Sequence, residues 1–396
     1  MSQQDVVIAS ATRTPIGCFQ GALSPLSASD LGALVVREAV KRAGATPDEV
    51  DVVIMGNVLS AGVGQAPARQ CVIKADFPVS TSAVTINKVC GSGLQAVMYA
   101  RREIMIGEAD VVVAGGMESM TNAPYIIPKA RAGLRLGNAE IVDTMIMDGL
   151  WDPYGDMHMG VCGDLVAEKC GFTREDQDEF AATSYRRALA AQKEGRFKPE
   201  IVPVAIPNRR GEPLLVDADE EPGRGKIEKF ASLSPAFGRD GTVTAANASS
   251  LNDGAAALVV CSAAVAKAKR YKVLARILAD SSAAVEPKWF TLAPVDALAK
   301  LYAKTETKPS DWDLYEINEA FSGVTMAAAK EHGIPLENVN VNGGAVSLGH
   351  PIGCSGARVL VTLLYALADR KLKRGIATLC IGGGEAVALA VECVQP

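Results

Sequence analysis

The stretch that decides the fold is Ile86-Asn-Lys-Val-Cys90-Gly-Ser-Gly93-Leu-Gln-Ala-Val-Met-Tyr-Ala100. A run of β-branched and polar residues ends at one cysteine, two glycines follow at once, and apolar residues then recur at helical spacing. This order predicts a strand, a tight turn and a helix, with Cys90 at the junction. Because a sulfur at a helix N-terminus faces unpaired N–H groups and the positive end of the helix dipole, we expect the thiolate to be favoured there. Cys90 is therefore a candidate nucleophile, although a cysteine of arbitrary position is more often a small core residue.

Composition narrows the class of protein. The chain of 396 residues is 48% hydrophobic and 21% charged, which suits large cores in two or three domains. Its formal net charge of −5 does not predict the basic surface that binds DNA or RNA. No signal or transit peptide is recognisable, and no uninterrupted apolar run is long enough to predict a membrane helix. Nine scattered cysteines without a C-x-x-C pair argue against disulfides and against a metal site. We expect a cytoplasmic protein with no nucleic-acid or membrane partner.

Strands and helices alternate at both ends of the chain. Residues 5–10, 50–55 and 109–116 read as buried strands, the last ending in paired glycines, and residues 27–44 predict a helix. Continuous apolar strands alternating with helices indicate a mostly parallel sheet covered on both faces. Residues 120–240 differ, because they are rich in proline and contain one strong helical pattern, near residues 173–194. A segment this long and irregular predicts a functional insertion, which we call the loop domain.

The segment after about residue 270 repeats the first. Residues 46–54 parallel residues 308–316, the turn at 90–93 parallels 353–356, and 114–117 parallel 381–384, all at nearly one offset. Such repeated segments predict two similar α/β halves that face each other, so that equivalent turns meet. The expected domains are residues 1–119 with 241–270, the loop domain 120–240, and residues 271–396.

The second half supplies three stretches suited to chemistry. Residues 316–321 put two acids and an amide at a strand end, residues 342–356 hold His350 in a glycine-rich loop, and Cys380 ends a strand before three glycines. The chain has only three histidines, so His350 is a candidate base for Cys90 rather than a solvated loop residue. Cys380 is by type a core residue, but the glycines behind it free backbone N–H groups for an oxyanion hole.

Seven motifs, in order along nearly the whole chain, resemble those of the thiolases and, within that family, the acetyl-CoA C-acetyltransferases. They are Asn87-Lys-Val-Cys90-Gly-Ser-Gly93, Gly115-Gly-Met-Glu-Ser119, His158-Met-Gly160, Asn247-Ala-Ser249, Asn318-Glu-Ala-Phe321, Gly349-His-Pro-Ile-Gly-Cys-Ser-Gly356 and Cys380-Ile-Gly-Gly-Gly384. The resemblance implies an α/β thiolase fold, with two similar mixed-sheet halves packed together and an inserted loop domain. It also implies a reversible, ping-pong Claisen condensation of two acetyl-CoA into acetoacetyl-CoA and CoA through an acetyl-cysteine.

The resemblance assigns roles to the candidate residues. Cys90 would carry the acetyl group while His350 takes its proton, and Cys380 would remove an α-proton from the second acetyl-CoA. The N–H groups of Cys90 and Gly382 would meet the acyl oxyanion, and His350 with a water held by Asn318 would meet the enolate.

The same resemblance implies that the loop domain holds the coenzyme A tail. The substrate-binding residues by match are Leu150, His158, Met159, Ser249, Phe290, Ala320 and Phe321. Ordinary packing is an equal alternative for Leu150 and Ala320. The residues that would meet the coenzyme A phosphates are Arg224, Lys226 and Lys229, for which a solvated charged loop is the alternative.

This sequence departs from the family pattern in three places. Glu385 follows the last glycine of the Cys380 motif where the family often has another glycine, and Ser250 stands at a common glycine position. Residues 285–290 resemble the mitochondrial-type enzymes, some of which are potassium-stimulated and accept a 2-methyl substrate. Pro222 stands where those enzymes use a tyrosine, which puts a potassium site in doubt. No permanently bound cofactor is implied, because coenzyme A and acetyl-CoA are substrates.

Several alternatives stay open. The nearest alternative is a 3-ketoacyl-CoA thiolase that acts on longer acyl chains. If Phe290 forms a wall of the acyl pocket, it disfavours this alternative. A β-ketoacyl synthase shares the fold but needs no cysteine at position 380. A dinucleotide-binding protein is disfavoured because no G-x-G-x-x-G follows a strand, while a non-catalytic coenzyme A-binding protein remains possible. The family is usually dimeric or tetrameric, so we expect a homotetramer or homodimer, with residues 125–136 as a candidate assembly element.

Overall fold

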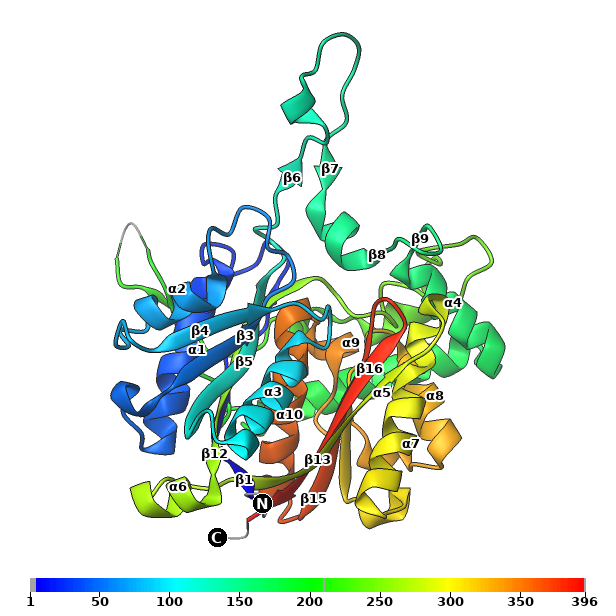
Figure 1. The fold of residues 1–396 in the computed structure, drawn as a ribbon. Coiled ribbons are helices and arrows are strands. Elements are labelled where there is room, and N and C mark those ends of the chain that lie inside the picture. The colour runs from blue at the N-terminus through cyan, green and yellow to red at the C-terminus, as the bar shows by residue number, and fades with distance from the viewer. Residues whose placement is uncertain (1–4, 209–210, 395–396) are drawn as a thin grey trace.

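A continuous β-sheet runs through both ends of the chain in this computed structural model, which describes residues 5–208 and 211–394 (Figure 1). Its strands are β1 (Val6–Arg13), β2 (Gly17–Cys18), β3 (Val52–Gly56), β4 (Ser82–Ile86), β5 (Val111–Ser119), β12 (Asn252–Ser262), β13 (Ala275–Ala284), β14 (Leu314–Ile317), β15 (Arg374–Ile381) and β16 (Glu385–Cys393). They are ordered β14-β15-β16-β13-β1-β12-β5-β3-β4, with β2 beside β12.

The strand directions correct one expectation. Among the described strands, β3 is parallel to β4 and β5, and β14 is parallel to β15, whereas the other neighbours are antiparallel. The prediction of a mostly parallel sheet is therefore wrong, although each half is mixed as the family resemblance implies. A continuous apolar run reports that both faces of a strand are buried, and it does not report the direction of the neighbouring strand.

The two halves repeat one arrangement. The series β3-β5-β12-β1 in the first half corresponds to β14-β15-β16-β13 in the second, with one parallel pair followed by two antiparallel pairs in both. The equivalent helices are α1 (Ala28–Ala43) with α7 (Ala293–Thr305), α3 (Ser92–Ile106) with α10 (Ile352–Asp369), and the short η1 (Pro47–Glu49) with η7 (Pro309–Asp311). The predicted duplication is confirmed.

The helices α3 and α10 lie between the sheets of the two halves and share a core with β5, β12, β15 and β16 (Figure 1). The outer face of the first half is covered by α1 and α2 (Pro67–Lys74), and that of the second half by α7 and α8 (Ser322–His332). A Cβ on Gly93 would stand 2.6 Å from Ala357 N, and one on Gly356 would stand 2.4 Å from Leu94 N. The equivalent glycine turns therefore meet at the crossing of the central helices, as predicted.

Among the helices of the described residues, α10 is the one that is long and apolar enough to cross a membrane. Most of its surface is buried between the two sheets, which is the position of a core helix in a layered α/β fold.

Local signals place several elements correctly. Helix α1 begins after Ser27, whose side chain forms a capping box with Asp30, and it ends at Gly44, which has a φ of 79°. The strand β5 instead continues through Gly115 and Gly116, where the sequence predicts its end. A Cβ at Gly115 would stand 2.0 Å from Ala256 O, so glycine is needed there for close approach of a neighbouring strand.

The loop domain is less regular than the two halves, and its expected helix is confirmed. Helix α5 (Arg174–Lys193) begins after Thr173 with a capping box. Helix α4 (Met159–Cys170) is an element that the sequence did not predict. The remaining strands of the loop domain are β6 (Tyr125–Ile126), β7 (Val142–Asp143), β8 (Trp151–Asp152), β9 (Met157–His158), β10 (Val204–Ile206) and β11 (Leu214–Val216). Its short helices are η2 (Ala130–Ala132), η3 (Ile146–Leu150), η4 (Pro222–Arg224) and η5 (Ile227–Ser232).

The strands β6 and β7 form the base of a hairpin that projects from the molecule (Figure 1). The other short helices of the chain are α6 (Ala263–Lys269), η6 (Pro287–Leu292), η8 (Leu336–Asn338) and α9 (Ala345–Leu348). The exact domain bounds stay a prediction.

Candidate active site

A cavity of about 360 Å³ brings together residues from both halves and the loop domain. Its wall is mostly apolar, with a few polar groups, which is typical of a small-molecule site. The residues expected at the site that line it are Cys90, Leu150, His158, Met159, Ser249, Phe290, Ala320, Phe321, His350 and Gly382. The predicted nucleophile and the predicted base thus face one cavity, although they are far apart in the sequence.

The Cys90 turn is strained and tightly hydrogen-bonded. Val89, directly before the cysteine, has a φ of 43°, a left-handed conformation that β-branched residues rarely adopt. The backbone N–H of Lys88 donates to Ser92 Oγ at 2.8 Å, and that hydroxyl donates to Val89 O at 2.7 Å. The backbone N–H of Val89 donates to Asn87 Oδ1 at 2.9 Å. These bonds hold the turn so that the sulfur stands between β4 and α3 at the cavity wall, as the sequence predicts.

The protonation state of Cys90 corrects a second expectation. Burial raises the pKa of the Cys90 thiol to about 11, although backbone N–H groups of Gly382 and of Cys90 itself lower it. Desolvation of the anion therefore outweighs the helix N-terminus, and the resting sulfur is a thiol. A base must take its proton before or during attack on a carbonyl carbon.

His350 is a buried residue between two helices, and not part of an open loop. It lies between α9 and α10 with 7% of its surface exposed. Its backbone N–H donates to Asn252 Oδ1 at 2.9 Å, and Gly349 before it has a φ of 104°. Burial, and then the charge of Arg358, lower the pKa of His350 to about 3. The ring is therefore neutral at ordinary pH and can accept a proton.

Asn318 follows β14 and is also buried. Its Oδ1 accepts a long hydrogen bond of 3.5 Å from Arg358, which pairs at the same distance with Glu316 Oε2. Its Nδ2 has no partner among the described residues. Asn318 does not line the cavity itself, but it retains unused N–H donors, which suit it to hold a water.

Cys380 lies at the end of β15 with no exposed surface. It belongs to an apolar cluster with Met159, Phe290 and Phe321, all of which line the cavity. Burial raises its pKa well above the ordinary value, and the nearby Cys90 raises it further. The second cysteine thus lies directly behind the cavity wall, close enough to Cys90 for the charge of one sulfur to affect the other.

The turn after Cys380 is linked to the turn that carries Cys90. Gly383 and Gly384 have φ values of 90° and 91°, so this β15–β16 turn requires glycine. Glu385, one of the departures from the family pattern, forms an ion pair with Lys88. The departure therefore joins the two turns instead of disrupting the second one.

Sequence reasoning missed several residues of the wall. The Phe237 ring stacks on His158 with centroids 4.6 Å apart, and it meets the Phe321 ring edge-on. Gly160 allows this, since a Cβ there would stand 2.2 Å from the Phe237 ring. The other missed residues of the wall are Val89, Met120, Met145, Ile146, Gly149, Ala236, Thr244, Ala245, Ala248, Ser250, Leu251 and Ile352. Most are small or apolar residues without a spacing signal that would distinguish them from ordinary core.

The predicted phosphate contacts lie outside this cavity wall. Arg224 ends η4, and Lys226 and Lys229 lie at η5 on the surface of the loop domain. Within residues 5–208 and 211–394, no group of three or more His, Cys, Asp or Glu side chains is arranged to hold a metal ion.

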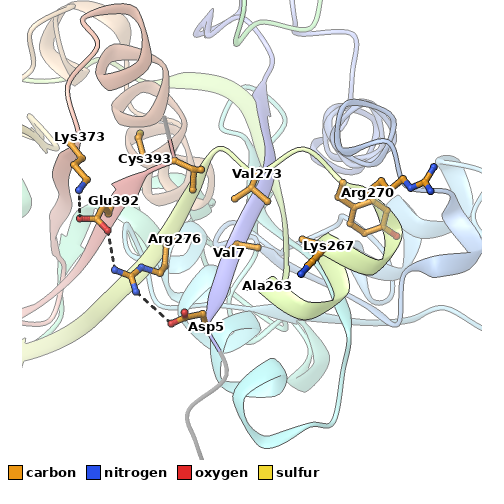
Figure 2. Close-up of a pocket in the computed structure, with 13 residues that line it drawn as sticks. Asp5, Val7, Ala263, Lys267, Arg270, Val273, Arg276, Lys373, Glu392 and Cys393 are labelled. Atoms are coloured by element: carbon orange, nitrogen blue, oxygen red, sulfur yellow. Dashed lines mark hydrogen bonds and ion pairs between the residues drawn. The ribbon is translucent and has the colours of Figure 1, made fainter. Parts of the chain in front are cut away.

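A second hollow, of about 760 Å³, lies beside the N-terminal end of β1 (Figure 2). Its charged side chains pair mainly with one another: Arg276 contacts Asp5 and Glu392, and Lys373 also contacts Glu392. The carboxylates of this larger hollow are held in ion pairs, and no histidine is among its described lining residues, so the smaller cavity is the candidate active site.

Comparison with known proteins agrees with the geometry. Residues 6–264 match the family model described as the thiolase N-terminal domain, and residues 271–393 match the thiolase C-terminal domain. An acetyl-CoA acetyltransferase of Pseudomonas aeruginosa is 53% identical over 98% of this chain and 99% of that relative. The crystal structure of the Bacillus anthracis acetyl-CoA acetyltransferase has a TM-score of 0.96 and 44% identity, covering 99% of both chains. A thiolase from Ascaris suum in complex with coenzyme A has a TM-score of 0.94 and 44% identity, covering 99% of this chain and 100% of that one.

Proposed function

This chain belongs to the thiolase family, and on that premise we infer that it is an acetyl-CoA acetyltransferase, an acyltransferase that joins two acetyl-CoA into acetoacetyl-CoA and CoA. The observation that carries this conclusion is the shared cavity of Cys90 and His350, with Cys380 directly behind its wall. A condensing acyltransferase needs one group to hold the acyl unit and another to remove an α-proton, and the two thiols suit these two tasks.

We propose that the first half-reaction acetylates Cys90. Its sulfur attacks the thioester carbonyl carbon of acetyl-CoA while the S–H proton passes to His350 Nε2. The oxyanion that forms is met by the backbone N–H groups of Cys90 and Gly382, which already lower the pKa of the resting thiol. The carbon–sulfur bond to coenzyme A then breaks, and the departing thiolate takes the proton of Cys380. Acetyl-Cys90, an imidazolium at His350 and a thiolate at Cys380 remain.

The second half-reaction uses these charges. The Cys380 thiolate takes an α-proton from a second acetyl-CoA, and the enolate oxygen is met by His350 and by a water on Asn318. The enolate carbon attacks the acetyl carbonyl, so that the carbon–carbon bond forms and the bond to Cys90 breaks. The Cys90 sulfur recovers its proton from His350. The protons balance, and the site returns to two thiols and a neutral imidazole, which is the resting state that burial favours.

The cavity wall supports a short acyl group. Phe290 is buried in the apolar cluster behind the cavity, and Leu150 and Phe321 line the same wall. The nearest alternative is a 3-ketoacyl-CoA thiolase of longer chain length. We expect kcat/KM for thiolysis of acetoacetyl-CoA to exceed that for 3-ketooctanoyl-CoA by at least about tenfold, because the longer chain has to displace this packing.

A chain-length assay tests the proposal. Comparable values for the two substrates would favour the longer-chain thiolase, and tight coenzyme A binding without thiolysis would favour a non-catalytic binder. Phe290→Ala is the matched variant, because the space it opens should raise the relative rate of 3-ketooctanoyl-CoA. Replacing potassium by sodium in the same assay is expected to leave kcat unchanged.

We propose that coenzyme A binds through the loop domain without any permanently bound cofactor. The stacked His158 and Phe237 rings form an apolar passage for the pantetheine arm, and Ser249 adds a hydroxyl at the wall. Arg224, Lys226 and Lys229 are the cations proposed to meet the phosphates. The free thiols on all nine cysteines, which all lie in the described ranges, suit a reducing cytoplasm.

We also propose that the protein is a homotetramer or homodimer. The projecting hairpin exposes apolar side chains, among them Tyr125, Leu134 and Leu136. On the edge strand β4, 46% of Val84 is accessible, and Val79 just before the strand is 79% accessible. Apolar surface of this kind and an open sheet edge are typical of an interface. Light scattering should give a multiple of the chain mass, and a monomer at micromolar concentration would contradict the proposal.

A further inference from the structure

The imidazole of His350 has one ring nitrogen held and the other left without a partner. Nδ1 lies 2.5 Å from Ser355 Oγ, whereas the buried Nε2 has no hydrogen-bond partner among the described residues. Since His350 lines the cavity together with Cys90, Nε2 is the nitrogen that remains for the thiol or the substrate. A neutral imidazole has one donor and one acceptor nitrogen, so the position of its proton decides whether Nε2 can act as a base.

The hydrogen bonds of Ser355 favour one position for that proton. Its Oγ lies 3.0 Å from the carbonyl oxygen of Pro351, which can only accept. A hydroxyl carries a single proton, so if Ser355 gives it to Pro351, it must accept the N–H of His350 Nδ1. In the reverse arrangement Nε2 would carry the proton, and a buried N–H would be left without an acceptor in the described part of the chain.

The first half of the molecule contains an equivalent serine that makes equivalent hydrogen bonds. Ser92 corresponds to Ser355 in the internal repeat, and both are buried on the first turn of a central helix. Ser92 accepts a hydrogen bond from Lys88 and donates one to the carbonyl of Val89, which fixes the turn that carries Cys90. Each serine thus accepts from one group and donates to a carbonyl within the preceding four residues.

We propose that Ser355 is a positioning residue that holds His350 with its proton on Nδ1 and its Nε2 lone pair free for the thiol of Cys90. The proposal rests on the proposed function and adds the group that prepares the base. When Sγ bonds to the acetyl carbon, the thiol proton moves to Nε2, and the Nδ1–H of the imidazolium stays bonded to Ser355. The hydroxyl therefore orients the base and also stabilises the cation that it becomes.

Pre-steady-state acetylation of Cys90 by acetyl-CoA tests the proposal. Ser355→Ala is expected to slow acetylation at pH 7 by about 10- to 100-fold, with little change in the acetyl-CoA concentration that gives half the maximal rate. The defect should shrink as pH rises, because the thiol then ionises without help. Ser355→Thr, which keeps the hydroxyl, should recover most of the rate. The control is Ser347→Ala, a buried serine on α9 that is bonded to Ser184 and to Gly344 O, and it should keep the rate of the unaltered enzyme.

Nitrogen NMR of ¹⁵N-histidine-labelled enzyme tests the tautomer directly. The chain has only three histidines, so the His350 signals can be assigned as those that the His350→Asn variant lacks. The expected spectrum has the proton on Nδ1 of His350 in the unaltered enzyme. A proton on Nε2, or a Ser355→Ala enzyme with an unchanged rate and pH profile, would overturn the proposal, as would an equal loss in Ser347→Ala. Absence of acetylation at Cys90 in the unaltered enzyme would overturn the proposed function instead, and the spectrum would still decide the tautomer.

Discussion

The turns that begin α3 and α10 occupy equivalent positions in the two halves, yet they bring different groups to the cavity. In the first half, Cys90 stands on a strained turn and lines the cavity. Its counterpart in the repeat is Gly353, where a Cβ would stand 2.7 Å from Glu118 Oε2 and 2.8 Å from a backbone oxygen. The second half contributes His350 from just before its turn, and its own cysteine at this turn, Cys354, is fully buried.

This difference underlies the proposed division of the reaction between the two halves. The crossing of the two central helices requires Gly93 and Gly356, so both turns are fixed close together. With the backbones fixed, the chemistry depends on which neighbouring position has room for a side chain. A side chain fits at position 90 of the first half but not at its counterpart Gly353, and the second half lines the cavity with His350 just before its turn. In the proposed mechanism the first half carries the acyl group, and the second half supplies the groups that move protons.

Among changes to the second half, the largest effect is expected when it loses the thiol proposed to move protons. Cys380→Ser should lower condensation by about 10²- to 10⁴-fold, because a serine hydroxyl is far less acidic than a thiol and does not form the anion that takes the α-proton. Acetyl-Cys90 should still accumulate on longer incubation, since the nucleophile in the first half is intact. Condensation assays and intact mass after incubation with acetyl-CoA measure the two outcomes. Near-normal condensation by this variant would show that the division between the halves is wrong.

The pH dependence of Cys90 alkylation tests the base in the second half. Burial and Arg358 lower the pKa of His350 to about 3, so the ring stays neutral and should assist alkylation by iodoacetamide equally from about pH 5.5 to 8. In His350→Asn only the thiolate can react. Because the Cys90 pKa is raised to about 11, the rate should then climb about tenfold per pH unit across that range.

The unaltered enzyme is the control for this profile. Mass spectrometry of the Cys90 peptide measures the extent of alkylation in both enzymes. A loss of reactivity below about pH 6.5 in the unaltered enzyme would mean that His350 titrates as an ordinary, solvated histidine. That result would contradict the buried neutral base.

A smaller effect is expected at the crossing of the helices. Gly356→Ala introduces a Cβ 2.4 Å from Leu94 N, so α3 and α10 must separate. Overpacking of this kind costs about 1–3 kcal/mol of the free energy of unfolding, and the shifted turns should also lower activity. Gly223→Ala is the control, because nothing lies within 4 Å of a Cβ at that position. Equal unfolding midpoints in urea for the two variants would contradict the claim that the helix crossing requires glycine at position 356.

The smallest effect is expected at Cys354. Although it belongs to the turn equivalent to that of Cys90, it packs in the core between the two sheets, whereas Cys380 packs against residues that line the cavity. Cys354→Ala should keep activity within about twofold and lose only the packing of one buried sulfur, as for small core deletions. Steady-state kinetics with acetoacetyl-CoA would measure this. A loss as large as that of Cys380→Ser would show that the two turns are not specialised.

The parts of this fold that sequence could predict depend on local signals. Helix α1 follows from its capping serine and terminal Gly44, and the Cys90 turn follows from a strand, a pair of glycines and a helical pattern. The internal repeat was visible because glycine and proline recur at the turns of both halves. It predicted that residues near positions 90 and 353 would meet, and the helix crossing confirms this.

What sequence could not predict depends on contacts between distant segments. Strand β5 runs through Gly115 because of a neighbouring strand, and the pKa of Cys90 rises because of burial that its own turn does not reveal. Phe237 reaches the site from an irregular segment through its contacts with His158 and Phe321. The roles of Cys90, His350, Cys380 and Asn318 were named from the family resemblance and stay predictions until they are measured.

The central claim is that the thiol of the first half, and not that of the second, carries the acetyl group. Incubation with acetyl-CoA labelled in the acetyl group, followed by digestion and mapping, tests it most directly. We expect the label on the Cys90 peptide of the unaltered enzyme, of Cys354→Ala and of Cys380→Ser, and no label in an inactive Cys90→Ala. Label on another cysteine, or full activity in Cys90→Ala, would contradict the account.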